Sequence, residues 1–269
     1  MNPLERIFLL LSILPFACFS QGISHPDTFP GAIIVQLPER NEAQLKKLTL
    51  EEAHLQCTSW RVAVEANNLS PWKTIPEDCA DYVKEYMTGN GYEFDLQRVY
   101  NEAGIYARSV NLNGDGKDAW IFDVDETLLS NLPYYAEHGY GLEMFNSTKF
   151  DQWVEMGTAP AIESSLKLYE EVLGLGFKVI LLTGRSERHR GITVENLLRG
   201  GFREWDKLLL RSSEDHGKTA TLYKSDKRNE LIEEGYRILG NSGDQWSDLL
   251  GSSMSKRSFK LPNPMYFIP

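Results

Sequence analysis

Two aspartates separated by one residue follow a short apolar run in the middle of the chain. The segment reads IFDVDET, and in it Asp123 and Asp125 leave what we expect to be a buried strand. Charged side chains are rarely buried unless they are paired or bind a metal, which favours a functional site over an ordinary turn. If strand geometry persists here, both carboxylates point to the same side. One can then attack a substrate while the other transfers protons.

A carboxylate nucleophile suits the hydrolysis of phosphomonoesters. Attack by Asp123 on phosphorus would give an aspartyl-phosphate, which water can cleave. Asp125 would protonate the leaving alkoxide and then deprotonate that water. Because Asp123 and the phosphate are both anionic, the attack needs a cation between them. Mg²⁺ suits a site whose ligands are carboxylates, phosphate and water.

Polar residues after later apolar runs could complete such a site. The TGR sequence at 183–185 offers the hydroxyl of Thr183 to a phosphoryl oxygen, and Gly184 would let the backbone approach closely. The GDQWSD sequence at 243–248 offers Asp244 as a second carboxylate for Mg²⁺. These groups are the ones that phosphoryl transfer to a carboxylate requires.

A lysine would also be needed, and the segment YKSDKR offers two. Lys224 would neutralise the charge that remains on Asp123 and on the phosphoryl group. By residue type alone, Lys224 and Lys227 are both open for this role, and both could be surface charges. Arg185 and His189 are at most candidates for contacts on the substrate side.

These residues need a scaffold that brings strand ends together. Short apolar runs alternate with segments of helical pattern in the second half of the chain, at 119–122, 177–182, 207–210 and 236–240. This alternation is typical of a parallel sheet covered by helices on both faces. Ligand sites in such sheets lie just beyond the carboxyl ends of the strands. We therefore predict an α/β fold with a Rossmann-like parallel sheet.

The first half of the chain has a different organisation. Residues 1–20 read as a signal peptide, because their apolar run is shorter than the roughly 20 residues that span a membrane. We expect an extended segment at 21–39 and a helical region at 40–112, which could cap the site. Residues 113–269 would form the catalytic core.

The predicted secretory route bears on the cysteines and on two sequons. Without the signal peptide, Cys57 and Cys79 remain as an even pair, so we expect one disulfide between them. The sequons at Asn68 and Asn146 are compatible with glycosylation. The net charge of -10 argues against a nucleic-acid partner or an anionic membrane reached through a basic surface.

Other motifs are explained equally well by a structural role, without a catalytic or metal-binding one. The sequence NLNGDG begins like a calcium-binding loop, but its twelfth position is Phe122 where a bidentate glutamate is required, so we interpret it as a turn. The five histidines lack paired ligand spacing, which argues against a zinc site or a phosphatase of the histidine type. Tyr134 and Tyr135 could line a pocket, although packing in the core explains them equally well.

Four of these segments together point to a known family. An isolated Asp-x-Asp pair is usually a solvated turn, but DVDET, LLTGR, YKSDKR and GDQWSD resemble, in order and spacing, the four motifs of the haloacid-dehalogenase-like phosphatases. The wider sequence, including WIFDVDETLLSNLPYY and NPMYFIP, is similar to the plant acid phosphatase and vegetative storage protein family, which is class B acid phosphatase-like. The resemblance extends from roughly residue 50 to the last residue.

The resemblance implies a role for each motif. Asp123 is implied as the nucleophile and Asp125 as the acid and base, with Thr183 and Lys224 as phosphate-binding residues, Asp244 as an Mg²⁺ ligand, Asp248 in support, and a metal contact from the backbone carbonyl of Asp125. The resemblance also prefers Lys224 to Lys227. Since some storage members of this family have lost the nucleophile, the presence of Asp123 favours an active enzyme.

Three functional hypotheses follow. The first is a secreted or vacuolar, Mg²⁺-dependent acid phosphatase. The second is a vegetative storage protein with weak residual activity, and the third is a module that only binds a phosphate-containing ligand. The expected partner is a small phosphomonoester, with no nucleic acid and, after signal cleavage, no membrane. Whether the chain forms a homodimer is left open by the sequence.

Overall fold

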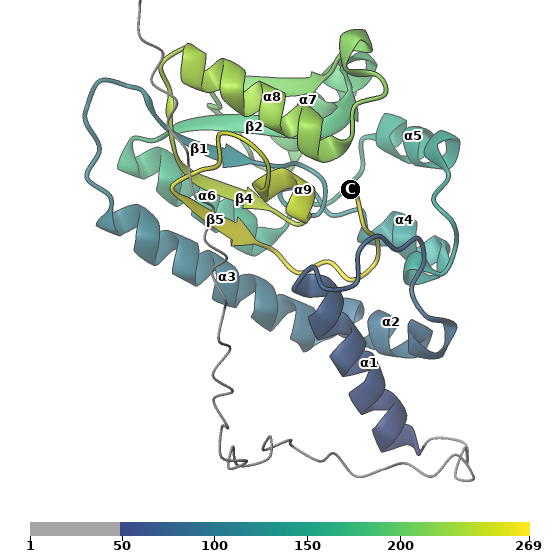
Figure 1. Cartoon of the computed structure of the whole chain (residues 1–269). Coiled ribbons are helices and arrows are strands. Elements are labelled where there is room, and N and C mark those ends of the chain that lie inside the picture. The colour runs from purple at the N-terminus through teal and green to yellow at the C-terminus, as the bar shows by residue number, and fades with distance from the viewer. Residues whose placement is uncertain (1–48) are drawn as a thin grey trace, which may run out of the picture. The chain divides into compact units, whose positions relative to one another are not determined.

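A five-stranded parallel sheet forms the centre of the described chain, which in this computed structural model covers residues 49–269. The predicted signal peptide and extended segment lie outside the described residues. The strands are β1 (Asp118–Phe122), β2 (Lys178–Ser186), β3 (Lys207–Arg211), β4 (Arg237–Gly243) and β5 (Arg257–Lys260). Their order in the sheet is β3-β2-β1-β4-β5, and all neighbours are parallel (Figure 1). This sheet confirms the predicted Rossmann-like α/β fold.

The chain changes direction across the sheet between β3 and β4. β2 and β3 lie on one side of β1, whereas β4 and β5 lie on the other. The space beyond the carboxyl ends of β1 and β4 is therefore the topological switch point, where open α/β sheets bind ligands. The apolar runs predict β1 to β4 but not β5, because RSFK contains no apolar run. A short, charged strand is typical of a sheet edge.

Nine helices accompany the sheet in the part of the chain that the structure describes. They are α1 (Leu50–Glu65), α2 (Ala80–Thr88), α3 (Asn90–Ser109), α4 (Leu132–Glu137), α5 (Ser147–Met156), α6 (Glu163–Leu175), α7 (Arg190–Arg199), α8 (Ala220–Glu233) and α9 (Trp246–Leu249). α1 begins with a capping box, in which the Thr49 hydroxyl accepts from the Glu52 N–H and the Glu52 carboxylate accepts from the Thr49 N–H. These bonds satisfy two backbone donors at the start of the helix.

Helices cover both faces of the sheet, as the continuous apolar strands require. Alternate strand residues face opposite ways, so Trp120 packs in the cluster that contains α3 and α6, whereas Ile121 packs with α8. β4 contributes Gly240 directly against the Trp120 ring. A Cβ atom there would lie 2.3 Å from Cε3 of Trp120, so only glycine permits this approach.

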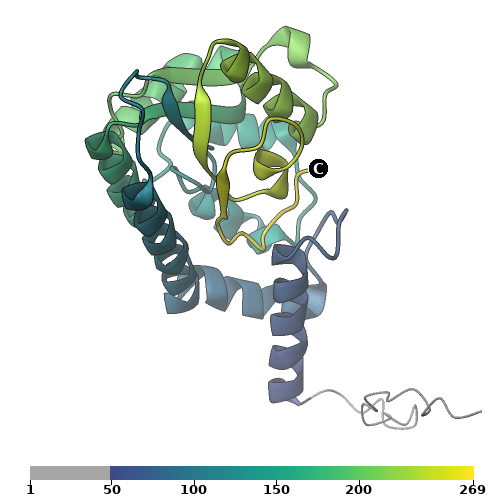
Figure 2. The ribbon, with the colours of Figure 1, turned by 60° about the vertical axis from the view of Figure 1, so that its left-hand side comes forward.

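The first three described helices lie together on one side of the sheet, with α1 in dark blue and α2 and α3 in lighter blue (Figure 1, Figure 2). Cys57 of α1 and Cys79, just before α2, form a disulfide. Glu65, the last residue of α1, reaches the C-terminal part of the chain: its carboxylate accepts from Lys260 Nζ and from the Asn263 N–H, each at 2.8 Å. Its carbonyl accepts from Trp246 Nε1 at 2.9 Å. The end of α1 is thus hydrogen-bonded to residues that come before and after β5 in the sequence.

Two smaller observations concern earlier expectations. The NLNGDG segment ends in a bend, and Asp115 and Asp118 both bind Arg237, so these carboxylates already have a cation. Within residues 49–269, no helix combines the length and the hydropathy needed to cross a bilayer. The domain boundaries proposed at residues 40 and 113 stay predictions.

Candidate active site

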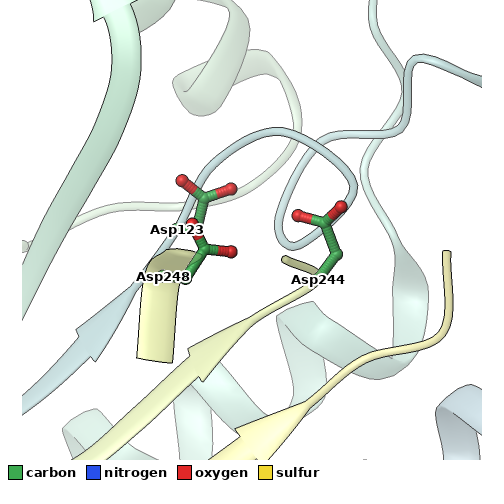
Figure 3. A group of neighbouring side chains, drawn as sticks. All are labelled: Asp123, Asp244 and Asp248. Atoms are coloured by element: carbon green, nitrogen blue, oxygen red, sulfur yellow. The ribbon is translucent and has the colours of Figure 1, made fainter. Parts of the chain in front are cut away.

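Three buried carboxylates meet at the switch point of the sheet. Asp123 follows β1, Asp244 follows β4, and Asp248 lies in the short helix α9 (Figure 3). Each offers one carboxylate oxygen, and these atoms lie within 4.8 Å of one another. The Asp123 N–H donates to the Ser242 carbonyl at 3.0 Å, which continues the pairing of β1 with β4 beyond the end of β1. The sheet itself therefore sets the separation of the first two carboxylates.

A buried lysine joins two of these carboxylates. Lys224 extends from α8, and its Nζ donates to Asp123 Oδ1 at 2.5 Å and also to Asp248 Oδ1. Burial alone would lower the pKa of Lys224, but the charges of Asp123 and Asp248 outweigh it and raise that pKa. The lysine is therefore an ammonium ion. Lys227, one helical turn further, instead binds Glu230 at 2.9 Å on the helix surface.

The carboxylates carry more negative charge than this lysine can neutralise. When all are ionised, three carboxylates and one ammonium group sum to -2. Burial raises the pKa of Asp123 well above its ordinary value despite Lys224, and burial with the charge of Asp248 raises the pKa of Asp244 to about 7. An oxygen-ligated divalent cation would relieve this repulsion, so the donor set fits a hard metal ion.

The carboxylate of Asp125 lies outside this group of three. Arg185, from the end of β2, donates to both of its oxygens, with Nη2 to Oδ1 at 2.8 Å. Asn131 Nδ2 donates to Oδ1 at 2.9 Å. Burial opposes ionisation of Asp125, but the charge and hydrogen bonds of Arg185 prevail and lower its pKa. These partners hold the side chain, and the metal contact that the resemblance implies for Asp125 is one from its backbone carbonyl.

Buried hydrogen bonds of Glu126 and Asn131 hold the loop after Asp125 in place. Glu126 is fully buried with a φ of 50°, a left-handed conformation that is uncommon for a glutamate. Its carboxylate accepts from the Asn131 N–H. The Asn131 side chain then accepts from Trp153 Nε1 at 2.8 Å while it donates to Asp125. Sequence reasoning missed Asn131, because an asparagine before a short helix has no signal of its own.

Two of the expected phosphate-binding residues, Thr183 and Gly184, lie at the end of β2. Thr183 is buried, and its hydroxyl accepts from the Arg185 N–H at 3.1 Å and approaches Asp125 Oδ2 at 3.4 Å. Gly184 is exposed and lines the pocket described below. A Cβ at Gly184 would meet no atom within 4 Å, so the space next to this residue is open.

A pocket of about 430 Å³ opens above the aspartates. Asp123, Asp125, Asp244 and Asp248 lie at its base. The other lining residues include basic side chains and apolar ones: Arg185, His189, Arg211, His216 and Lys224, and Tyr135, Phe145, Phe150, Val154, Tyr266 and Ile268. In the described chain, all of its lining residues lie between 123 and 268, so α1 to α3 contribute none. A groove of about 690 Å³ between α3 and α6 is larger, but it contains none of the four motifs.

The two adjacent tyrosines have different environments. Tyr135 lines the pocket and stacks on Tyr266, with ring centroids 4.9 Å apart. Tyr134 packs instead against His138 and Phe150. One residue of this pair therefore lines the pocket, and the other belongs to the core.

The sequon asparagines are both on the surface. Asn68 follows α1 and is exposed. Asn146 is exposed as well, and its side-chain oxygen accepts from the Lys149 N–H at the start of α5. A glycan on the amide nitrogen would leave that oxygen in place. Glycosylation at either position stays a prediction.

Comparison with known proteins identifies the class to which this fold and site belong. The family model described as HAD superfamily, subfamily IIIB (Acid phosphatase) matches residues 41–269. The chain therefore belongs to this acid phosphatase family of the haloacid-dehalogenase-like superfamily, which confirms the resemblance seen in the four motifs.

Particular relatives include both enzymes and storage proteins. The chain is 65% identical to Acid phosphatase 1 of Solanum lycopersicum over 98% of this chain and 99% of that protein. It is 46% identical to the stem 28 kDa glycoprotein of Glycine max, over 80% of this chain and 84% of the relative. It is 38% identical to vegetative storage protein 1 of Arabidopsis thaliana, over 98% of this chain and 99% of that protein.

A solved structure shares the fold. The class C acid phosphatase from Bacillus anthracis aligns with a TM-score of 0.57 and 22% identity, over 69% of this chain and 83% of that chain. At this identity the likeness supports the fold of the core and nothing more.

Proposed function

We propose that this chain hydrolyses phosphate monoesters through an aspartyl-phosphate on Asp123, with Mg²⁺ as the cofactor. The observation that carries the proposal is the pairing of Asp123 with Lys224 at the base of a pocket at the switch point. The ammonium group beside Asp123 offsets part of the repulsion between this carboxylate and a phosphate dianion. The relation to Acid phosphatase 1 supports the same class of reaction.

The metal would be held by carboxylate oxygens of Asp123 and Asp244 and by the backbone carbonyl of Asp125. Asp248 would support this set, because its Oδ1 binds Lys224 and its Oδ2 accepts from the Gln245 N–H at 2.9 Å. When bound, Mg²⁺ would offset the repulsion between the nucleophile and the substrate. The excess negative charge of the carboxylates is the feature that supports a divalent cation here.

The protein groups then divide the work of two steps. In the first, an Asp123 oxygen bonds to phosphorus while the bond from phosphorus to the alkoxide breaks, and Asp125 gives its proton to the alkoxide. In the second, Asp125 takes a proton from the water that cleaves the aspartyl-phosphate. Lys224 and the Thr183 hydroxyl would bind the phosphoryl oxygens. A lowered pKa keeps Asp125 ionised, as the base of the second step must be. The first step needs the protonated form, so it depends on acid conditions.

The decisive experiment measures steady-state hydrolysis of aryl and alkyl phosphates by the mature chain, with a chelator and with Mg²⁺ restored. We expect activity to disappear with the chelator and to return with Mg²⁺. Asp123→Asn should reduce turnover to background, whereas Asp95→Asn, a matched change at a part-buried ion pair with Arg61 outside the pocket, should not. Full activity after exhaustive chelation, or normal turnover by Asp123→Asn, would overturn the proposal.

A storage role is the second candidate, and the relation to vegetative storage proteins favours it. Turnover per molecule separates the two roles, since a storage protein with residual activity would hydrolyse every substrate of the panel slowly. We further propose a secreted or vacuolar location, in accord with the glycoprotein and storage-protein relatives. The proposed partner is a small phosphomonoester. Binding of nucleic acid is not expected, and self-association is to be tested by sedimentation.

A further inference from the structure

Asp244 is held differently from the other carboxylates of the site. Its Oδ2 accepts two hydrogen bonds from neutral amides, one from Asn263 Nδ2 at 2.7 Å and one from Gln245 Nε2 at 2.8 Å. Among residues 49–269, no hydrogen bond reaches its Oδ1. One oxygen is thus doubly bonded by the protein, and the other is left for a ligand at the centre of the carboxylate group.

The orientation of both amides is determined by the backbone. Asn263 Oδ1 accepts from the Met265 N–H at 3.0 Å, and Gln245 Oε1 accepts from the Ile268 N–H at 3.0 Å. Because a backbone N–H can only donate, each amide must turn its oxygen toward that N–H and its NH₂ group toward Asp244. Neither amide can flip without placing two donors in contact. The C-terminal segment, residues 261–269, therefore sets the direction of both donors.

The C-terminal segment is itself anchored at two places. Near its start, the Asn263 N–H donates to Glu65 at the end of α1. At its end, the Pro269 carbonyl accepts from the Ala220 N–H at the start of α8, at 3.0 Å. Asn263 is buried, so its bond to Asp244 is shielded from water. The geometry at Asp244 therefore depends on contacts that lie outside all four sequence motifs.

The neutral character of the donors matters for a cation. Lys224 neutralises Asp123, and Arg185 neutralises Asp125, whereas Asp244 receives two hydrogen bonds and no positive charge from its partners. Because both amides are neutral, they orient the Asp244 carboxylate without neutralising its charge when it is ionised. We propose that Asn263 and Gln245 are positioning residues for the divalent cation, which fix Asp244 so that Oδ1 faces Asp123. The inference rests on the metal dependence in the proposed function.

The test is direct titration of Mg²⁺ into the full chain by calorimetry, without substrate, together with thermal unfolding in chelator. Asn263→Leu has a similar volume and removes one of the two amide donors to Asp244, while the Gln245 donor stays in place. Loss of a group that orients a metal ligand costs on the order of 10-fold or more in metal affinity. We expect Asn263→Leu to raise the Kd for Mg²⁺ by about 10-fold.

Glu65→Gln is the matched control. It weakens the anchor of the same segment but leaves both amides on Asp244, so its Kd should change by less than about twofold. If Asn263→Leu does not fold, Asn263→Ala replaces it in the same titration. A parent chain that binds Mg²⁺ and an Asn263 variant with the same Kd would overturn the positioning role alone. A parent chain that binds no Mg²⁺ would overturn the metal-dependent function, and the positioning role with it.

Discussion

Arg185 donates to both carboxylate oxygens of Asp125, from Nε at 3.1 Å to each and from Nη2 to Oδ1 at 2.8 Å. This bidentate pair joins the ends of the neighbouring strands β2 and β1, and it lowers the pKa of Asp125 although burial opposes ionisation. The proposed general acid is thus held in its ionised form. Its protonated form is populated only at low pH.

The pH profile should therefore depend on Arg185. Arg185→Gln removes the charge that lowers the pKa of Asp125, so this pKa should rise, and protonated Asp125 should persist to higher pH. We expect the pH at which hydrolysis of an alkyl phosphate declines to move upward, while kcat/KM falls because Asp125 loses the hydrogen bonds that orient it. Arg190→Gln changes an arginine that pairs with Glu187 on the surface, and it should leave the profile in place. An unshifted profile in Arg185→Gln would show that Asp125 does not limit the reaction.

The leaving group should separate the two aspartates of the DVDET motif. With Asp125→Asn, the rate of hydrolysis should fall more for alkyl phosphates than for aryl phosphates, because aryl leaving groups need less protonation. The second step loses its base as well, so aspartyl-phosphate should accumulate with an aryl substrate. Trapping followed by mass spectrometry should locate it at Asp123. A label on a histidine or serine, or equal losses with both substrates, would contradict these roles.

Stability without metal should fall as the pH rises. The folded state raises the pKa of Asp244 to about 7 and that of Asp123 well above 3.8, so it binds protons more tightly than the unfolded chain does. Stability is then greatest below the unfolded pKa, and it decreases as pH increases toward the folded values, by up to about 1.4 kcal/mol per pH unit for each proton. Denaturant unfolding in chelator between pH 4 and 8 measures this slope. Asp244→Asn should flatten it, and a slope unchanged in that variant would refute the assignment.

The disulfide between Cys57 and Cys79 should contribute measurably to stability. The two cysteines are 22 residues apart, and closing a loop of this length is worth about 3 kcal/mol in the chain-entropy model. The double variant Cys57→Ser, Cys79→Ser should unfold at a correspondingly lower denaturant concentration. Mass mapping of the non-reduced protein gives the independent check. Free thiols at both positions would disprove the pairing.

The sequence predicts well the features that depend on local pattern. Apolar runs predict β1 to β4, and because the carboxyl ends of parallel strands meet at one edge, they also predict that Asp123 and Asp244 lie close together. The pairing of Lys224 with Asp123 is different, since residue type left Lys227 equally open and only the family resemblance favoured Lys224. The face of α8 that each lysine occupies decides between them.

The features that escaped prediction depend on contacts between distant segments. Asn263 is 19 residues beyond Asp244, and only the path of the chain after β5 brings the two together. β5 itself has no apolar pattern, because an edge strand can be short and charged. The Arg185 contact with Asp125 requires the register of β2 against β1, which a single sequence does not reveal.

The bonds of Glu65 have a consequence for how such a protein can evolve. This residue accepts from Lys260, Asn263 and Trp246, so the end of α1 is built into the support of Asp244. A lineage that lost or exchanged α1 would disturb the catalytic edge of the sheet in the same event. The helix and the sheet are therefore expected to be inherited together, and recombination should be tolerated at positions before α1 more readily than between α1 and β1.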